Sequence, residues 1–313
     1  MTITRKELDE IAARVRNWGR WGTDDQRGTL NHIDPAVLMR AAAEVTSGKL
    51  FNLGLNFDAN GPQMEKRRFN PKLYVTDRAS EMSPNAPGMV FSDDVIHMPL
   101  QAATQWDALA HVHYDGVLYN GCKACDTLSD KGAARLGIEN LAQPGIMSRG
   151  VLLDIARLKG MDLLPVGYEI TTDDLTAACK AQDVAIEAGD ILMVRTGHIR
   201  RFTIDGDRAA FNGIQPGLSA RCADWIHEKS LAAICADNLA VEVLNASMGN
   251  LDTALPLHML CLRDMGCPLG EMFNMEALAQ DCAADGRYTV LIAAPPLAVT
   301  HGVGSPVNPL VLK

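Results

Sequence analysis

The segment from Gln101 to His113 concentrates side chains that can perform acid–base or metal chemistry. Within thirteen residues it holds Gln101, Gln105, Asp107, His111 and His113, directly after the apolar-tending run 95–100. On an extended strand these odd-numbered positions would share one face. Oxygen ligands and imidazoles on one face suit a divalent metal or an activated water. Hydrogen bonding of these groups to one another at a buried sheet edge is the structural alternative.

The composition is that of a folded globular protein. The chain has 313 residues, of which 47% are hydrophobic and 21% charged, and it is long enough to bury a full core. A net charge of -9 argues against nucleic acid or an anionic membrane surface as a partner, because both need clustered Lys and Arg. The isolated pair Arg67-Arg68 is therefore interpreted as solvated surface.

The sequence shows no targeting signal, and its cysteine usage is typical of a cytoplasmic protein. The N-terminal residues contain no apolar signal region, and no window approaches the roughly 18 apolar residues of a membrane span. Eight scattered cysteines are more typical of reduced thiols than of a disulfide framework. We expect a cytoplasmic protein that acts on a small molecule.

Capping signals predict two helices in the first 50 residues. Thr4-x-x-Glu7 is a capping box before an apolar stripe, and Asp34-Pro35 is typical of a helix start, with an end expected near Gly48. Residues from about 51 to 76 are expected to be irregular. The Pro- and Gly-containing stretch 77–91 is predicted to be a long loop of the kind that forms lids or partner contacts.

Strand-like and helix-like patterns alternate along the rest of the chain. Apolar runs predict strands at 150–154, 190–195, 231–235 and 288–292, and helical periodicity covers 172–182, 219–229 and 275–284. This alternation indicates an α/β protein with a sheet covered by helices. No Gly-x-Gly-x-x-Gly motif follows a strand and no Walker lysine is present, so we expect no nucleotide cofactor.

Several ordered blocks resemble a known family. Gln101-x-Ala-Thr-Gln-x-Asp-x-Leu-x-His111 resembles the His-x-Gly-Thr-His-x-Asp-x-Pro-x-His signature of the cyclase-type hydrolases, which include bacterial kynurenine formamidase and isatin hydrolase. Blocks at 150–154, 189–197, 216–218, 237–242 and 304–309 follow in the family's order. The resemblance implies a swivelling β/β/α fold over residues 51–313, a homodimer or homotetramer, and a divalent metal that hydrolyses amides or lactams.

The motif departs from the family at two ligand positions. The family's two metal-binding histidines fall on Gln101 and Gln105, whereas the aspartate is kept as Asp107. His258 and Glu271 resemble the family's downstream ligand pair. A glutamine carbonyl is a weak, hard ligand, poorly suited to zinc but acceptable to manganese. We expect one divalent metal, Mn or Zn, at these positions, or an Asp–His–Glu network that activates water without metal.

The resemblance implies a hydrolase that cleaves a C–N or C–O bond of a cyclic amide, formamide or lactone. His111 would be the general acid/base, Asp107 would act with the metal, and Thr104 or a glutamine would bind the oxyanion. Further side chains are candidates for the substrate pocket: His113, His301, Trp106 and Trp21. The alternatives are a metal-independent cyclase, lyase or isomerase that uses Asp107 and His111, or a non-catalytic ligand-binding member of the family.

The first 50 residues form a predicted N-terminal helical arm outside the region of family likeness. Two short amphipathic helices need an apolar surface to pack on. That surface belongs either to the same subunit or to a neighbour whose pocket the arm would help to close.

Overall fold

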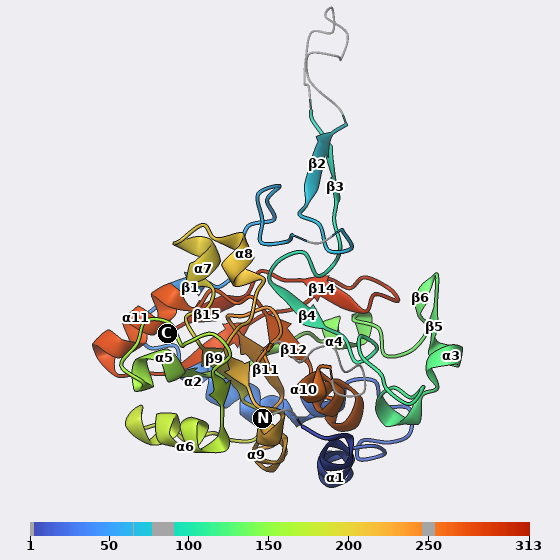
Figure 1. Ribbon diagram of the computed structural model, residues 1–313, viewed down its shortest axis with the longest axis horizontal. Coiled ribbons are helices and arrows are strands. Elements are labelled where there is room, and N and C mark those ends of the chain that lie inside the picture. The colour runs from blue at the N-terminus through green and yellow to red at the C-terminus, as the bar shows by residue number, and fades with distance from the viewer. Residues whose placement is uncertain (1–2, 65, 77–90, 246–253) are drawn as a thin grey trace, which may run out of the picture.

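A nine-stranded mixed sheet forms the centre of the molecule (Figure 1). The computed structural model describes residues 3–64, 66–76, 91–245 and 254–313. The strands run in the order β1 (Leu50–Asn52), β15 (Leu310–Leu312), β13 (Thr289–Ala293), β7 (Met147–Asp154), β9 (Ile191–Arg195), β11 (Ala233–Ala236), β12 (Leu269–Glu271), β4 (Gln105–Asp107) and β14 (Gly304–Pro306). Strands β7, β9, β11 and β12 are parallel, and those on either side pair antiparallel.

Strands β9 and β11 are almost entirely apolar because both faces of the sheet are buried there. Along β9, Leu192 and Val194 pack into one hydrophobic cluster, while Ile191 and Met193 pack into the other. Parallel strands covered on both faces have such continuous apolar runs. The predicted strands at 150–154, 190–195, 231–235 and 288–292 are confirmed as β7, β9, β11 and β13. The α/β class is confirmed with them.

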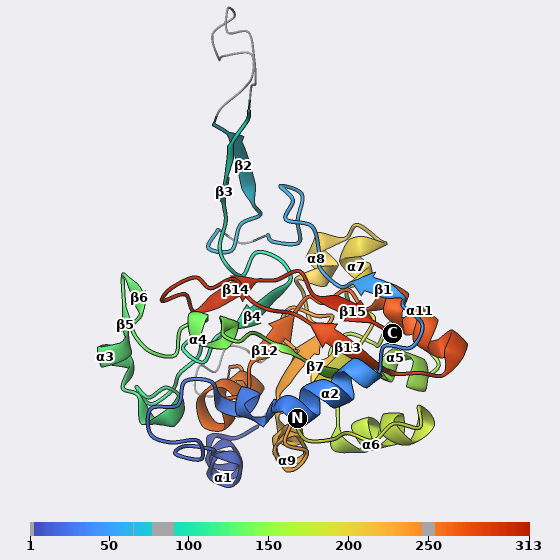
Figure 2. The same ribbon diagram turned by 180° about the vertical axis from the view of Figure 1, so that it is seen from behind.

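Helices cover both faces of this sheet (Figures 1 and 2). One cluster receives side chains from α1 (Arg5–Val15), α6 (Thr172–Ala181), α9 (Ala223–Glu228), α10 (Pro256–His258) and the π-helix η5 (Met259–Met265). The other receives α4 (Glu139–Ala142) and α11 (Glu276–Asp285), and α2 (Pro35–Ala43) packs against β7 and β13. The predicted helices at 172–182, 219–229 and 275–284 are confirmed in α6, α9 and α11.

Short elements complete the chain. They are η1 (Gly28–His32), η2 (Tyr119–Gly121), α3 (Ala124–Thr127), β5 (Leu128–Ser129), β6 (Gly132–Ala133), α5 (Ile155–Leu158), β8 (Glu169–Ile170), α7 (Arg200–Thr203), α8 (Arg208–Phe211), β10 (Gly217–Leu218) and η3 (Ala220–Cys222). No helix in the ranges that the structure describes combines the length and the apolar character that a membrane span needs. All eight cysteines are free thiols.

The expectation of irregular chain over 51–76 is wrong in part. Strand β1 closes one edge of the sheet, and β2 (Lys72–Val75) pairs with β3 (Asp94–His97) in an antiparallel hairpin. This hairpin projects from the body of the molecule (Figures 1 and 2), and its strand residues are exposed. Most of the predicted long loop at 77–91 lies outside the described residues, which omit 77–90.

The N-terminal helices pack on their own chain. The Thr4 hydroxyl caps α1 by accepting a hydrogen bond from the Glu7 backbone N–H at 3.2 Å, and the apolar stripe of α1 is buried against α9 and η5. Asp34 caps α2 as predicted, although this helix ends at Ala43 rather than near Gly48. The structure therefore supports the first of the two alternatives for the arm.

Replacement of Leu8 by alanine tests this packing. Leu8 lies fully buried in α1, so Leu8→Ala should lower the free energy of unfolding by about 2–5 kcal/mol, the usual cost of such a cavity. Urea unfolding measures the loss. The matched control is Leu38→Ala, because Leu38 is 38% exposed on α2, and it should cost less than about 1 kcal/mol. A Leu8→Ala protein of unchanged stability but smaller mass by light scattering would show that the arm crosses to a neighbour.

Candidate functional site

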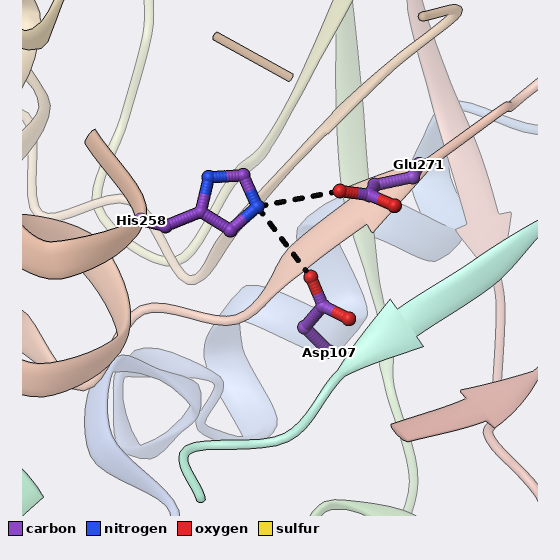
Figure 3. Close-up of side chains that lie close together, drawn as sticks. All are labelled: Asp107, His258 and Glu271. Carbon is purple, nitrogen blue, oxygen red and sulfur yellow. Dashed lines mark hydrogen bonds and ion pairs between the residues drawn. The ribbon is translucent and has the colours of Figure 1, made fainter. Parts of the chain in front are cut away.

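The pairing of β4 with β12 brings two carboxylates to one face of the sheet. Glu271 lies opposite Gln105 in the antiparallel register, and Asp107 is two residues further along β4, so it points to the same side. His258 approaches from α10 (Figure 3). One ligand atom from each of Asp107, His258 and Glu271 lies within 4.8 Å of the others, and all three residues are buried.

The imidazole of His258 is held between acidic groups. Its Nε2 lies 3.3 Å from Glu271 Oε1 and 3.7 Å from Asp107 Oδ2 (Figure 3). Its Nδ1 lies 2.6 Å from Glu242 Oε1. Glu242 also accepts the backbone N–H groups of Leu257 (3.1 Å) and His258 (2.9 Å). A carboxylate on Nδ1 fixes the ring and leaves Nε2 directed at the other two carboxylates, which is how ligand histidines are oriented around metals.

Burial and charge together set the ionisation of this cluster. Burial alone would lower the pKa of His258, but the three surrounding carboxylates raise it well above its usual range. Burial and the neighbouring Asp107 raise the pKa of Glu271. Burial acts on Asp107 in the same direction, yet the adjacent imidazoles of His111 and His258 lower its pKa. The site is thus a dense group of buried charges that needs positive charge for balance.

Backbone strain surrounds the two glutamates. Val241, directly before Glu242, has φ 58°, and Met272, directly after Glu271, has φ 59°. Left-handed backbone is costly for residues with a branched or bulky side chain, and it clusters at functional sites. Gly217 lies against the same segment, because a Cβ on it would be 2.3 Å from the Glu242 carbonyl carbon. The backbone is therefore strained next to both Glu242 and Glu271.

Gln105 contributes an amide to the cluster. Its Nε2 donates to Glu271 Oε2 at 2.5 Å and lies 3.4 Å from Asp107 Oδ1. Two buried oxygens nearby, Gln105 Oε1 and Asp107 Oδ2, have no hydrogen-bond partner among the described residues. Buried polar atoms are rarely left unpaired. Two carboxylates, one oriented imidazole and an orphaned carboxylate oxygen fit a single divalent metal.

His111 approaches the same centre through a turn. Strand β4 ends at Asp107, and the His111 backbone N–H donates to Ala108 O. The predicted extended chain from 101 to 113 is therefore wrong beyond the strand. The turn nevertheless places His111 Nε2 3.7 Å from Asp107 Oδ1, with 19% of its side chain exposed. Burial lowers the pKa of His111 although Asp107 opposes the shift, which favours the neutral ring that can accept a proton.

A cavity of about 520 Å³ opens onto these groups and is lined by His111, His258 and Glu271. Arg67 and Arg68 line the same cavity, so their interpretation as simple solvated surface is corrected. Arg68 Nη1 lies 3.9 Å from Glu271 Oε2. Both arginines belong to a loop without periodic pattern, which gives the sequence no signal for their position.

Thr104 and Trp106, on either side of Gln105, make contacts that prevent their predicted roles. The Thr104 hydroxyl donates to Met272 O at 2.7 Å and accepts the Leu55 N–H at 2.8 Å, so its one proton is used and it is not an oxyanion donor. Trp106 points to the opposite face of β4, packs on Phe273 and donates its indole N–H to Ala294 O. It belongs to the core rather than to a substrate pocket.

Four further candidates are not among the residues that line the cavity. His113 is exposed, and His301 Nδ1 lies 2.9 Å from Ala133 O. Trp21 packs edge-on against His32 in the N-terminal connector. Gln101 lies in the turn before β4, with its amide nitrogen against Gly304. Of the two glutamines, the structure thus brings only Gln105 into hydrogen-bond contact with the acidic cluster.

Glu242 is the principal residue that the sequence prediction lacked. It falls within the block at 237–242 that resembles the family, and the sequence predicts no role for it. It lies on an irregular segment, as the isolated bridge between Leu218 and Glu242 indicates, so no periodicity marks it. Its contact with His258, sixteen residues away, depends on tertiary structure alone.

Comparisons with known proteins agree on one family and fold. Residues 31–243 match the family model described as "Putative cyclase". The crystal structure of a novel cyclase is 41% identical, with a TM-score of 0.86 over 96% of this chain and 100% of that chain. Isatin hydrolase A from Ralstonia solanacearum is 17% identical with a TM-score of 0.62 over 89% of this chain and 95% of that chain, which shows a shared fold. The swivelling β/β/α expectation is thereby confirmed.

A curated relative matches over a shorter range. Isatin hydrolase from Roseibium aggregatum is 28% identical over 149 residues, 46% of this chain and 52% of the relative. The chain thus spans about half the length of the curated relative that it matches.

Replacement of Glu242 by glutamine tests the orientation of His258. The neutral amide keeps the size of the side chain but weakens three hydrogen bonds to the His258 segment. Loss of such an orienting group should lower the affinity for Mn²⁺ about 10- to 100-fold, as measured by competition with a chelator. Glu10→Gln, at an exposed position of α1, is the control. Equal Mn²⁺ affinity in Glu242→Gln and the parent protein would contradict the assignment.

Proposed function

The chain belongs to the cyclase family, and from this premise we propose that it is a metal-dependent hydrolase. Its substrate is a cyclic amide, formamide or lactone, in which a C–N or C–O bond is cleaved. The convergence of His111, His258 and Glu271 on one cavity of about 520 Å³ is the observation that supports this proposal most strongly. A base, a candidate metal site and space for a small molecule meet there.

Asp107, His258 and Glu271 are the proposed metal ligands. Manganese or zinc bound there would act as a Lewis acid that makes water a nucleophile near neutral pH. Glu242 keeps the His258 ring in place through its 2.6 Å contact with Nδ1. Gln105 lies against both carboxylates, and its amide carbonyl is an additional oxygen ligand of the kind that manganese accepts.

His111 is the proposed general acid/base. Because burial lowers its pKa, its neutral ring accepts the proton of the attacking water. The protonated ring of His111 then returns the proton to the leaving nitrogen or oxygen of the substrate. Asp107, 3.7 Å away, stabilises the imidazolium formed between the two steps. The apolar side chains of Leu239 and Leu255 line the cavity and limit the access of bulk water.

One observation favours a second candidate function. The Gln105 amide already donates to Glu271 at 2.5 Å and approaches Asp107 at 3.4 Å, so it partly satisfies the acidic pair. In that arrangement Asp107 and His111 would form an acid/base pair of a metal-independent cyclase, lyase or isomerase. Metal analysis after purification with added manganese or zinc separates the two, since the second candidate binds no stoichiometric metal.

Replacement of His111 by alanine tests the role of the base. His111→Ala should lower kcat for any substrate found among isatin, formanilide and simple lactones by at least about a hundredfold. His113→Ala is the matched control, because His113 is an exposed histidine two residues away, and its activity should equal that of the parent. Steady-state kinetics on folded variants measures both. Parent-like turnover in His111→Ala would rule out the assignment.

We also propose that the chain assembles into a homodimer or homotetramer. The β2–β3 hairpin supports this, because it exposes Leu73, Val75 and Ile96 on one face and Tyr74 and Val95 on the other. A two-stranded hairpin is marginally stable alone, and clustered exposed apolar side chains are typical of interfaces.

Light scattering measures the assembly directly. We expect a mass of two or four chains, whereas a species of 33.8 kDa would contradict the proposal. Replacement of both Leu73 and Ile96 by lysine should shift the protein to that smaller mass. Val166→Lys, at another exposed apolar position, is the control and should leave the mass unchanged.

A further inference from the structure

The lining of the cavity holds more cationic than acidic side chains. Arg67 and Arg68, hereafter the arginine pair, line it, and Glu271 is the one acidic residue among the described residues that do so. The ion pair of Arg68 with Glu271 is long, at 3.9 Å, and Arg67 is exposed without an acceptor in the described part of the chain. A chain of net charge -9 thus places two guanidinium groups at the mouth of its candidate site.

Apart from its two histidines, the rest of the lining consists of apolar side chains together with the amides of Gln63, Asn212 and Asn245. Ile214, Leu239 and Leu255 contribute aliphatic side chains, and Ile214 is 45% exposed. Such a surface contacts the hydrocarbon or ring portion of a ligand. The guanidinium group is planar and binds carboxylates through two parallel N–H···O bonds. The cavity therefore combines a recognition surface for an apolar body with a recognition site for one anionic group.

We propose that the arginine pair binds a carboxylate of the substrate. This inference rests on the proposed function and narrows its substrate class to an apolar amide, formamide or lactone that bears a carboxylate. Because Arg68 contacts Glu271, which belongs to the acidic cluster, the carboxylate lies next to the scissile carbonyl rather than at the far end of the molecule. The arginine pair determines specificity, while His111 and the acidic cluster perform the chemistry.

A matched pair of compounds tests the proposal. 2-Formamidobenzoate carries a carboxylate beside its formamide, and formanilide is the same molecule without it. The parent protein should hydrolyse the acid with a kcat/KM at least about tenfold above that of the neutral compound, because a charge-assisted hydrogen bond to the carboxylate contributes at least that factor. In the double variant Arg67→Gln/Arg68→Gln the ratio of the two kcat/KM values should fall about 10- to 100-fold.

Three controls show whether a change in the kcat/KM ratio comes from the arginine pair. Arg14→Gln removes one positive charge from the surface of α1, where Arg14 pairs with Asp224, and should leave the ratio unchanged. Arg67→Lys/Arg68→Lys keeps the charge and should recover part of the preference. The Mn²⁺ affinity and melting temperature of each variant show whether an effect acts through Glu271 or through folding. An unchanged ratio in the double glutamine variant, or a parent preference for formanilide, would overturn the inference.

A binding experiment separates this inference from the proposed function. Calorimetric titration with 2-formamidobenzoate and with formanilide reports affinity without turnover. If neither compound is hydrolysed but the acid binds in an arginine-dependent manner, the hydrolase proposal fails and the anion site stands. If formanilide is hydrolysed and the acid shows no arginine-dependent affinity, the hydrolase proposal stands and the anion site is wrong.

Discussion

The antiparallel register between β4 and β12 is the constraint on which the whole site depends. It sets Glu271 opposite Gln105, and the two-residue period of a strand then places Asp107 on the same face. Two carboxylates are thereby forced together in a buried space. Trp106, between Gln105 and Asp107 in sequence, packs into the core on the other face, so a slip of one residue would place a carboxylate in the core and the indole in the site. The register is consequently fixed by both faces of the strand at once.

Such a concentration of charge persists only because the surrounding structure compensates for it. Burial of two carboxylates is unfavourable unless cations and hydrogen bonds oppose it. Within the described residues, His258, Arg68 and the Gln105 amide provide that opposition, and Glu242 holds His258 in the orientation that serves it. Left-handed backbone next to Glu242 and Glu271 indicates that the fold accepts local strain to present these groups. This balance is what makes the centre suitable for a divalent cation.

The sequence predicted the parts of the structure that local patterns encode. The apolar runs of β7, β9 and β11 have the continuous character of buried parallel strands, and the run of β13 forms a strand that pairs antiparallel. Thr4 and Asp34 capped their helices as expected. The ligand positions Asp107, His258 and Glu271 came from family likeness. Glu242 and Arg68 could not be predicted, because their contacts join segments that are distant in sequence and lack periodicity. Thr104 failed as an oxyanion donor because backbone groups already occupy its hydroxyl.

Anomalous diffraction from crystals grown with Mn²⁺ tests the central claim most directly. A divalent metal held by the acidic cluster predicts one anomalous peak between Asp107, His258 and Glu271, with the Gln105 amide turned so that its nitrogen no longer bridges the carboxylates. The absence of any peak there at saturating Mn²⁺, with the amide still donating to Glu271, would contradict the account and favour acid–base chemistry without a metal.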